Sequence, residues 1–271
     1  MRGRDNGLES QKEDERARLK LVASAASAGV FAAVIFAGWP GIDLAVTSLF
    51  NLGPRHFVLN DSAVVSDFRT ICKVITWLAV IVALLGVVLA VTAKRYLFGL
   101  GMAQWLFLAL VLIIGPGLLV NEVLKGNWPR PRPINIVEFG GPNRFTPVLA
   151  RSGQCKQNCS FVSGEASSIY ALGFAVAMLI RRRRAALIGL ALVAGSLIGI
   201  IRIGQGGHFP SDVIFAAVFM AMTVALVHWL AFHPLFRLGL KFEHVNGGQS
   251  IASPPTMVAP ERETPGTIVR A

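Results

Sequence analysis

Between two long apolar runs, the chain carries the polar stretch Arg202-Ile-Gly-Gln-Gly-Gly-His208-Phe-Pro-Ser-Asp212. An arginine can hold a phosphate with a planar fork of donors, and a histidine can act as nucleophile or base when a third group holds its ring. Asp212 follows His208 by four residues, which is one helical turn if Pro210 begins a helix. The stretch is therefore a candidate for the His–Asp part of an active site beside an anion site. The alternative is that Arg202 and His208 are interfacial residues at the end of a membrane helix.

The composition is that of an integral membrane protein. Of the 271 residues, 54% are hydrophobic and 15% are charged, whereas a soluble domain carries about 25% charged residues. A helix that crosses the hydrocarbon core needs roughly 20 apolar residues. Six apolar runs predict an all-α bundle of six transmembrane helices, over residues 21–39, 71–92, 97–120, 166–180, 185–201 and 213–232. The fourth run is the shortest and is polar at its start, so we expect it to begin in a cavity rather than in lipid.

Three regions follow from this pattern: a cytoplasmic N-terminal arm over 1–20, a membrane domain over 21–241, and a disordered cytoplasmic tail over 242–271. The arm has charges of both signs and does not resemble a cleavable signal peptide, so the first span is expected to be a retained anchor. Short basic loops at Lys94-Arg95 and at 181–184 mark the cytoplasmic side. With six spans, both termini are then cytoplasmic and the other loops face outward.

The outward loop over 121–163 is basic, against the usual trend for translocated segments. Its cations are Lys125, Arg130, Arg132, Arg144, Arg151 and Lys156. Such a charge predicts an anionic ligand. The net charge of +11 is otherwise spread over many segments without a nucleic-acid motif, so no nucleic-acid partner is expected. Cys155 and Cys159 lie in the same loop, where an oxidising space favours a disulfide; a metal site with other ligands is the alternative.

Three polar clusters fall at the outward ends of the predicted spans. They are Lys125-Gly-Asn-Trp-Pro-Arg-Pro-Arg132-Pro133, Ser160-Phe-Val-Ser163-Gly164-Glu165 and the stretch quoted above. Three cations, Lys125, Arg132 and Arg202, would stabilise a phosphate and its transition state. Backbone N–H groups at a helix start near Ser163 and Gly164 would favour an anion. The sequence has no carboxylate cluster typical of magnesium or zinc, so we expect covalent phosphoryl transfer without a metal or another cofactor.

These clusters, in this order, resemble the three-part signature of the type-2 phosphatidic acid phosphatase superfamily. The matching residues are Lys125-x6-Arg132-Pro133, Ser163-Gly164 and Arg202-x5-His208-x3-Asp212. The resemblance implies that His208 is the nucleophile, that it forms a phosphohistidine, and that Asp212 orients it. It also implies a phosphate-binding set made of Lys125, Arg132, Ser163, Gly164 and Arg202.

Glu165 departs from the family pattern, in which a histidine follows the Ser-Gly pair and protonates the leaving oxygen. Glu165 is therefore the candidate for this catalytic acid. A neighbouring phosphate dianion favours the protonated acid, and neighbouring cations favour the carboxylate. Two alternatives stay open: Glu165 is structural and the leaving group needs little help, as in a sugar 1-phosphate or pyrophosphate, or the activity has been lost.

The segment from Cys155 to Glu165, preceded by Phe139-Gly-Gly141 and Phe145, is similar to bacterial lipid A phosphatases of this superfamily. The similarity implies a multi-pass protein of the bacterial inner membrane with a periplasmic active site, whose partners are the bilayer and a phospholipid or lipid A substrate. It distinguishes neither the 1- from the 4′-phosphate nor the oligomeric state. Undecaprenyl pyrophosphate or phosphatidylglycerol phosphate hydrolysis are alternative activities. An alternative of another class is a protein that binds or transports a lipid head group without catalysis.

Overall fold

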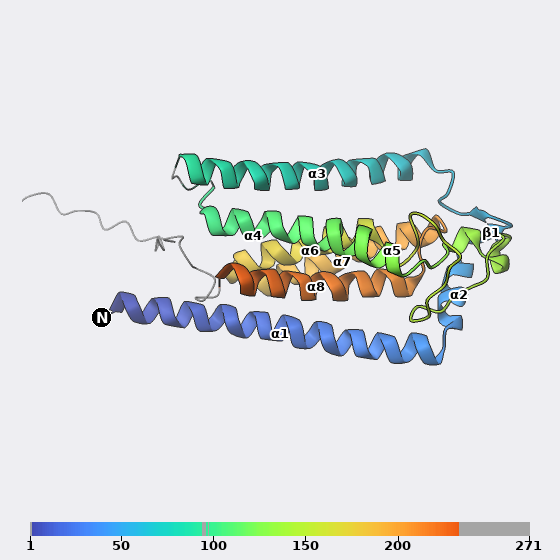
Figure 1. Cartoon of the computed structure of the whole chain (residues 1–271), viewed down its shortest axis with the longest axis horizontal. Helices are drawn as coiled ribbons and strands as arrows, with labels where there is room; N and C mark the ends of the chain where they lie inside the picture. Colours follow the sequence, from blue (N-terminus) through green and yellow to red (C-terminus); the bar gives the residue numbers. More distant parts are fainter. Residues whose placement is uncertain (1, 94–95, 97, 233–271) are drawn as a thin grey trace, which may run out of the picture. The chain divides into compact units, whose positions relative to one another are not determined.

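The computed structural model describes residues 2–93, 96 and 98–232, with side chains from residue 9 onward. The predicted tail over 242–271 and the basic turn at Lys94-Arg95 lie outside these described residues. The described part is a helical bundle that confirms the all-α prediction (Figure 1). Its main helices are α1 (Arg2–Gly38), α3 (Ala63–Thr92), α4 (Met102–Leu112), α6 (Gly164–Leu179), α7 (Arg184–Gly204) and α8 (Pro210–Phe232).

Five helical segments are long and apolar enough to cross a membrane: Glu9–Gly38, Ala63–Thr92, Met102–Asn127, Arg181–Gly204 and Pro210–Phe232. The chain is therefore a multi-pass membrane protein. The remaining predicted span, over 166–180, corresponds to α6, which is apolar but has only 16 residues. Half of the positions in α6 are buried by neighbouring helices, so protein rather than lipid surrounds much of it.

Several helix boundaries differ from the predicted ones, and the differences have local causes. The helix α1 begins at Arg2, so the predicted arm over 1–20 continues into the first span as one helix. The helix α3 begins at Ala63, because Ser62 caps it by accepting a hydrogen bond from the backbone N–H of Val65. This start lies eight residues before the predicted one. The helix therefore has about two further turns, which include the polar side chains of Asp67 and Arg69.

The third span is not a uniform α-helix. The helix α4 passes into the π-helix η1 (Ile113–Leu124), which contains Pro116, and then into the short α5 (Lys125–Asn127). Proline lacks an N–H and clashes with the carbonyl four residues earlier in an α-helix, so a local change of helix type at this point is expected. Lys125 lies near the C-terminal end of this span.

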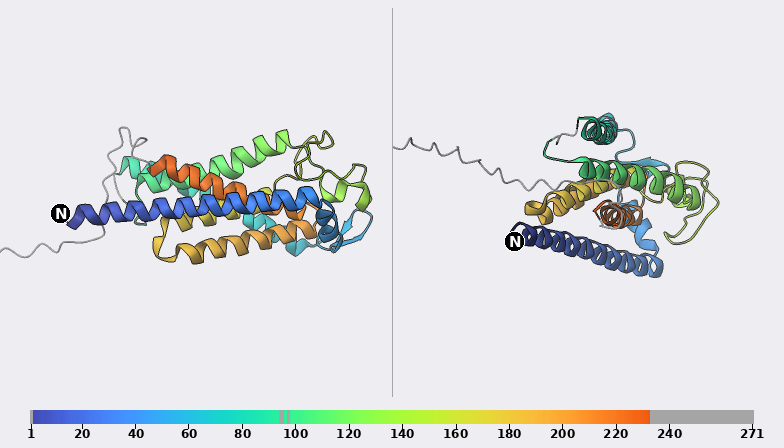
Figure 2. Two further views of the ribbon diagram at one scale, coloured as in Figure 1. Left: turned by 90° about the horizontal axis from the view of Figure 1, so that it is seen from below. Right: turned by 60° about the vertical axis from the view of Figure 1, so that its left-hand side comes forward.

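The helix α6 lies among its neighbours and packs against α7, α8, α4 and η1, whereas α1 packs mainly on α8 (Figure 2). The core between them contains large buried side chains such as Phe107, Tyr170, Phe174 and Met220. The helix α3 is attached on one side only, chiefly to α4, and three of its residues are buried: Ala83, Gly86 and Ala90. Gly86 faces the ring of Trp105, where a Cβ atom would clash. Much of α3 is therefore left for contact with lipid.

At the end of the bundle where α2 (Gly41–Ser48) lies, short elements and loops form a cap (Figure 1). The cap contains the hairpin β1 (Asn51–Gly53) and β2 (His56–Phe57), and the 3-10 turns η2 (Pro133–Asn135) and η3 (Val137–Phe139). A small second core joins Phe57, Ile136, Phe139 and Phe209. The second core packs against the loop between α7 and α8, which carries His208. At the other end of α6, the basic 3-10 turn η4 (Arg181–Arg183) separates α6 from α7.

Candidate active site

His208 lies in the short loop between α7 and α8, and this loop is fixed at both ends. The helix α7 ends at Gly204, whose carbonyl accepts a hydrogen bond from the backbone N–H of Leu59 over 2.9 Å. Gly206 has a φ of +63°, a left-handed conformation that favours glycine, and its carbonyl accepts from Ile134 over 3.0 Å. Pro210 begins α8, as the sequence predicted. The imidazole is consequently buried, with 3% of its residue surface exposed.

The imidazole of His208 is oriented by a backbone carbonyl. Its Nδ1 lies 2.7 Å from the carbonyl oxygen of Ser160, so Nδ1 must carry the proton and donate it. The carboxylate of Asp212, the expected partner, is farther away, at 3.8 Å from Nδ1. Burial lowers the pKa of His208 to about 4. At neutral pH the ring is thus neutral, with Nε2 unprotonated and available as a nucleophile.

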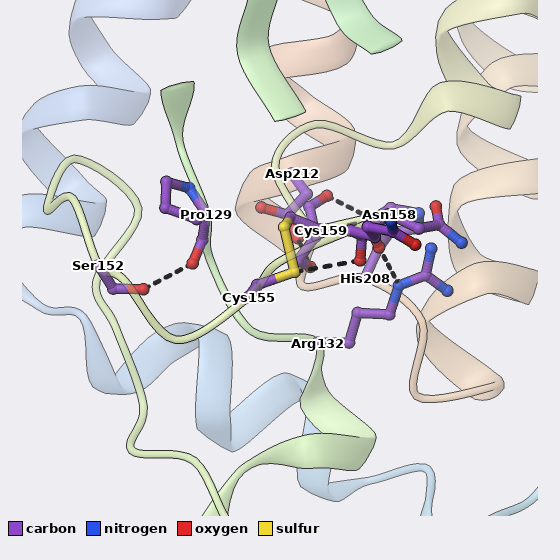
Figure 3. Close-up of a disulfide and its surroundings, with 10 residues drawn as sticks. Pro129, Arg132, Ser152, Cys155, Asn158, Cys159, His208 and Asp212 are labelled. Atoms are coloured by element: carbon purple, nitrogen blue, oxygen red, sulfur yellow. Dashed lines mark hydrogen bonds and ion pairs between the residues drawn. A yellow bond between two sulfur atoms is a disulfide. The ribbon is translucent and has the colours of Figure 1, made fainter. Parts of the chain in front are cut away.

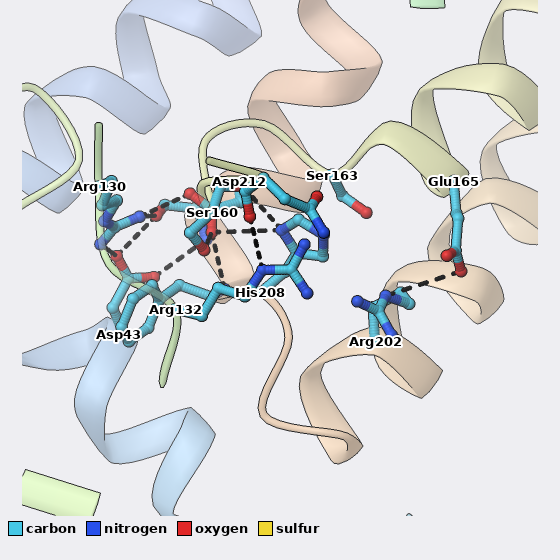
Figure 4. A network of polar contacts seen from close by, with 12 residues as sticks. Asp43, Arg130, Arg132, Ser160, Ser163, Glu165, Arg202, His208 and Asp212 are labelled. Atoms are coloured by element: carbon cyan, nitrogen blue, oxygen red, sulfur yellow. Dashed lines mark hydrogen bonds and ion pairs between the residues drawn. The ribbon is translucent and has the colours of Figure 1, made fainter. Parts of the chain in front are cut away.

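Asp212 acts on His208 mainly through Ser160. One carboxylate oxygen accepts from the guanidinium of Arg130 over 2.7 Å. The other accepts from the hydroxyl of Ser160 and from the backbone N–H of Phe209, the latter over 2.9 Å (Figure 4). Because the same Ser160 offers its carbonyl to His208, the fully buried Asp212 holds the group that orients the imidazole.

The charge of Asp212 is balanced by Arg130, which was predicted only as one of the loop cations. Arg130 has no exposed surface and donates also to Asp43 on α2 over 2.7 Å. Its guanidinium lies 4.2 Å from the ring centroid of Phe209. Asp43 in turn accepts from both the backbone N–H and the hydroxyl of Ser211, at 3.0 and 2.6 Å. Buried charges are tolerated when they are paired and hydrogen-bonded in this way.

Three predicted phosphate-binding cations meet at one cavity. Lys125, Arg132 and Arg202 line a cavity of about 630 Å³ together with His208. Arg132 donates to the carbonyl of Asn158 over 2.8 Å, and Arg202 donates to the side chain of Gln205 over 2.6 Å. Burial lowers the pKa of Arg132, and the positive charge of Arg69 lowers it further. A dianionic phosphate would relieve the repulsion between these cations.

The start of α6 also faces this cavity. Ser163 is the N-cap residue of α6, yet its buried hydroxyl has no hydrogen-bond partner among the described residues. A buried hydroxyl without a partner carries a desolvation cost that a ligand oxygen can relieve. Gly164 follows as the first helical residue, and a Cβ atom there would lie 3.3 Å from Nζ of Lys125. Gly164 thus lines the cavity together with the cations and His208, and Ser163 directly precedes it.

Glu165 is in the cavity wall but does not point toward the Ser160–His208 pair (Figure 4). Its two oxygens accept from the guanidinium of Arg69 on α3, at 2.7 and 3.0 Å. Nε of Arg202 lies 3.6 Å away and Nζ of Lys73 lies 3.8 Å away. Neither Arg69 nor Lys73 was predicted as a site residue, because Arg69 precedes the predicted second span over 71–92 and Lys73 falls within that span. Their spacing of four residues at the start of an apolar helix was the available signal.

Cys155 and Cys159 form a disulfide, with Cα atoms 5.7 Å apart (Figure 3). The closed loop contains Asn158, whose carbonyl accepts from Arg132, and Ser160 follows directly after it. The disulfide therefore constrains a segment that presents carbonyl acceptors to both Arg132 and His208. Among the described residues, His, Cys, Asp and Glu side chains do not gather in a group of three that could bind a metal ion.

Comparison with known proteins shows the family to which a chain with these three clusters belongs. The model of the PAP2 superfamily matches residues 104–235, a range that includes all three clusters. A lipid A 4′-phosphatase of Rhizobium leguminosarum is 34% identical over 194 residues, which cover 66% of this chain and 83% of the relative. The chain belongs to the PAP2 superfamily.

For two further relatives, the alignment covers a smaller part of each protein. A lipid A 4′-phosphatase of Francisella tularensis subsp. novicida is 44% identical over 128 residues, which cover 46% of this chain and 57% of that protein. A lipid A 1-phosphatase of Rhizobium etli is 31% identical over 159 residues, with 58% of this chain and 60% of the relative covered. No solved structure matches the chain.

Proposed function

We propose that this PAP2 protein is an integral-membrane phosphatase that removes a phosphate from lipid A through a phosphohistidine intermediate. The observation that carries the proposal is the neutral, buried imidazole of His208 at a cavity shared with Lys125, Arg132 and Arg202. A nucleophile without charge beside several cations suits attack on a phosphate dianion. The names of the relatives supply the lipid A assignment.

The hydrogen bond of His208 supports a different role for each of its ring nitrogens. Nε2, the nitrogen that does not donate to Ser160, attacks phosphorus, and a P–N bond forms while the P–O bond to the lipid breaks. The imidazolium that results is stabilised by Asp212 close to Nδ1. The leaving oxygen takes up a proton and the dephosphorylated lipid departs. Water then attacks phosphorus, the P–N bond breaks, and inorganic phosphate leaves.

The phosphate-binding residues would stabilise both transfer steps. Lys125, Arg132 and Arg202 oppose the negative charge of the phosphoryl oxygens, and the unpaired hydroxyl of Ser163 supplies a further donor. The N–H of Gly164 lies at the N-terminus of α6, where the helix dipole favours an anion. All five residues come from the motifs that the sequence predicted.

The rest of the cavity suits a lipid. Its lining includes apolar side chains from two neighbouring helical segments: Trp77 and Val80 of α3, and Ile113 and Leu118 of η1. Trp77 and Leu118 are also exposed on the bundle surface, where acyl chains of the bilayer would contact them. A substrate could thus place its phosphate at His208 while its chains remain in the membrane.

The proposed location is the bacterial inner membrane, with both termini cytoplasmic and the cavity facing the periplasm. The basic turn η4 lies between α6 and α7, at the opposite end of these helices from Gly164 and Gly204. Arginines in a short turn are typical of the cytoplasmic side. For the phosphate position, three relatives named lipid A 4′-phosphatase are 32–44% identical, against 31% for the 1-phosphatase, so the 4′-phosphate is the first to test.

Phosphate release by purified protein from lipid A, with a chelator present, tests the proposal. Wild type should release phosphate and be inhibited by vanadate, while His208→Ala should fold but be inactive. A protein that binds lipid A equally well in both forms and releases phosphate in neither would instead be a head-group binding or transport protein. Release from undecaprenyl pyrophosphate or phosphatidylglycerol phosphate, but not from lipid A, would correct the substrate.

A further inference from the structure

We propose that Arg69 of α3 is a further phosphate-binding residue, and that Glu165 is a positioning residue that holds Arg69 at the cavity. The inference rests on the proposed phosphatase function and refines it, because it replaces the predicted acid role of Glu165. None of the three motifs includes Arg69, which lies 56 residues before Lys125 in the chain.

Arg69 and Glu165 form a bidentate ion pair. Nε of Arg69 donates to one carboxylate oxygen over 3.0 Å, and an NH2 hydrogen donates to the other over 2.7 Å. The two side chains are mostly buried, with 23% and 16% of their surface exposed. Such bidentate pairs fix the plane of the guanidinium as well as its position. Arg69 is therefore held in one orientation in the cavity wall.

Arg69 keeps donors for a ligand while it is bound to Glu165. A guanidinium has five N–H donors, and the pair with Glu165 uses two of them. Arg69 lines the same cavity as His208 and Arg132. Its positive charge also contributes, after burial, to lowering the pKa of Arg132. The remaining donors of Arg69 thus lie within electrostatic range of the phosphate-binding cations.

Glu165 is poorly arranged to act as a proton donor. Each of its oxygens already accepts a hydrogen bond from Arg69, so a proton on either oxygen would replace one of these bonds. The nitrogens of Arg202 and Lys73 lie within 4 Å and favour the carboxylate. The same arrangement suits a positioning role. The carboxylate reduces the repulsion among Arg69, Lys73 and Arg202 before the substrate enters. The leaving oxygen would then take its proton from water.

The two roles of Glu165 differ in their dependence on the leaving group. A general acid matters most for an alkyl phosphate, whose alkoxide is a poor leaving group, and little for p-nitrophenyl phosphate. A residue that acts by placing Arg69 affects both substrates to the same degree. The variants for the comparison are Glu165→Gln, Arg69→Ala, Arg69→Lys and the double variant of Glu165→Gln with Arg69→Ala. Arg151→Gln is the matched control, because Arg151 is an exposed loop arginine over the ring of Trp128 and outside the cavity lining.

We expect Glu165→Gln and Arg69→Ala each to lower kcat/KM by roughly 10- to 100-fold, the range for a charge-assisted hydrogen bond. The loss should be equal for the two substrates, and the double variant should be no worse than Arg69→Ala. Arg69→Lys, which keeps the charge, should recover part of the activity, and Arg151→Gln should match wild type. A much larger loss with the alkyl phosphate in Glu165→Gln, or losses that multiply in the double variant, would overturn the inference.

Binding of inorganic phosphate separates this inference from the proposed function. It is measured by titration calorimetry in a His208→Ala background, where no turnover occurs. Arg69→Ala should weaken phosphate binding about tenfold or more, with unchanged thermal unfolding of the protein. Unchanged phosphate affinity would exclude Arg69 as a phosphate-binding residue even if wild type proved to be an active phosphatase. Weakened affinity in a protein without phosphatase activity would refute the proposed function alone.

Discussion

The guanidinium of Arg130 donates a hydrogen bond of 2.7 Å to Asp212, and neither side chain has any surface exposed to solvent. Arg130 also bonds to Asp43 on α2, so this pair connects the cap of the bundle to the first turn of α8. Through Ser160, Asp212 then fixes the carbonyl that orients His208. The imidazole of His208 is therefore held by a buried network that includes Asp43, a residue far in sequence from the three motifs.

Arg130→Ala should inactivate the enzyme and destabilise it strongly. Removing one partner of a buried ion pair typically costs roughly 3–5 kcal/mol, because the remaining charges stay buried without a partner. Here both Asp43 and Asp212 would lose their cation. Thermal unfolding and phosphate release measure the two effects. Asp43→Asn should destabilise the protein less, because asparagine keeps the shape of the side chain. Wild-type stability in both variants would show that the network does not stabilise the fold.

The acid stability of the protein should depend on His208. Its pKa is lowered from the usual 6.5 to about 4, because the buried ring is desolvated. Between these values the unfolded chain binds a proton and the folded protein does not, so stability falls as pH decreases from 6.5 towards 4 and is unaffected by this group above 6.5. The total effect is about 3 kcal/mol. Unfolding measured against pH for wild type and His208→Gln should differ in slope only in this window.

The pH dependence of turnover should reflect the same shift. His208 stays neutral, and therefore nucleophilic, down to about pH 4. Activity on a substrate whose phosphate does not titrate in this range should not show an acid limb near 6.5. A clear loss of kcat with an apparent pKa near 6.5 on such a substrate would mean that the imidazole is solvated in the working enzyme.

Ser163→Ala should separate binding from stability. The hydroxyl of Ser163 is buried without a hydrogen-bond partner among the described residues, so removing it should not destabilise the ligand-free protein. We expect weaker vanadate or phosphate binding, by about 3- to 10-fold, with unchanged or higher thermal stability. Lower stability together with unchanged phosphate affinity would assign the hydroxyl to helix capping instead.

Removal of the Cys155–Cys159 disulfide should reduce activity more than stability. The bridge constrains the segment whose carbonyls accept from Arg132 and His208. A displacement of such groups by about 1 Å can cost up to 10²-fold in rate. We expect the double Cys→Ser variant to lose on the order of tenfold in kcat/KM. Full activity after reduction of wild type would show that the loop keeps its position without the bridge.

The sequence predicted the parts of the fold and site that depend on local patterns. Apolar run length located the long spans, and the order of the three motifs located His208, Arg202 and the Ser163–Gly164 helix start. The fourth run was predicted to begin in a cavity, and α6 does begin at the cavity wall. These features are readable because neighbouring residues determine them.

The missed features depend on contacts between distant segments. Arg69 and Glu165 are 96 positions apart, and Asp43 and Arg130 are 87 apart. Nothing in the local sequence around Asp43, a single acid in an otherwise apolar segment, indicates a buried arginine as its partner. The proximity of Ser160 to His208 likewise depends on the contact between the segment after the disulfide and the first turn of α8. Such pairings require the three-dimensional arrangement.

The proposed reaction is the removal of a phosphate from lipid A by His208. The most direct test is mass spectrometry of lipid A from Gram-negative cells that express wild-type protein or His208→Ala at equal levels. Lipid A should lose the mass of one phosphate group with wild type only, and fragmentation then identifies the position. Lipid A that is identical in the two strains, or dephosphorylated in both, would contradict the proposed role of His208.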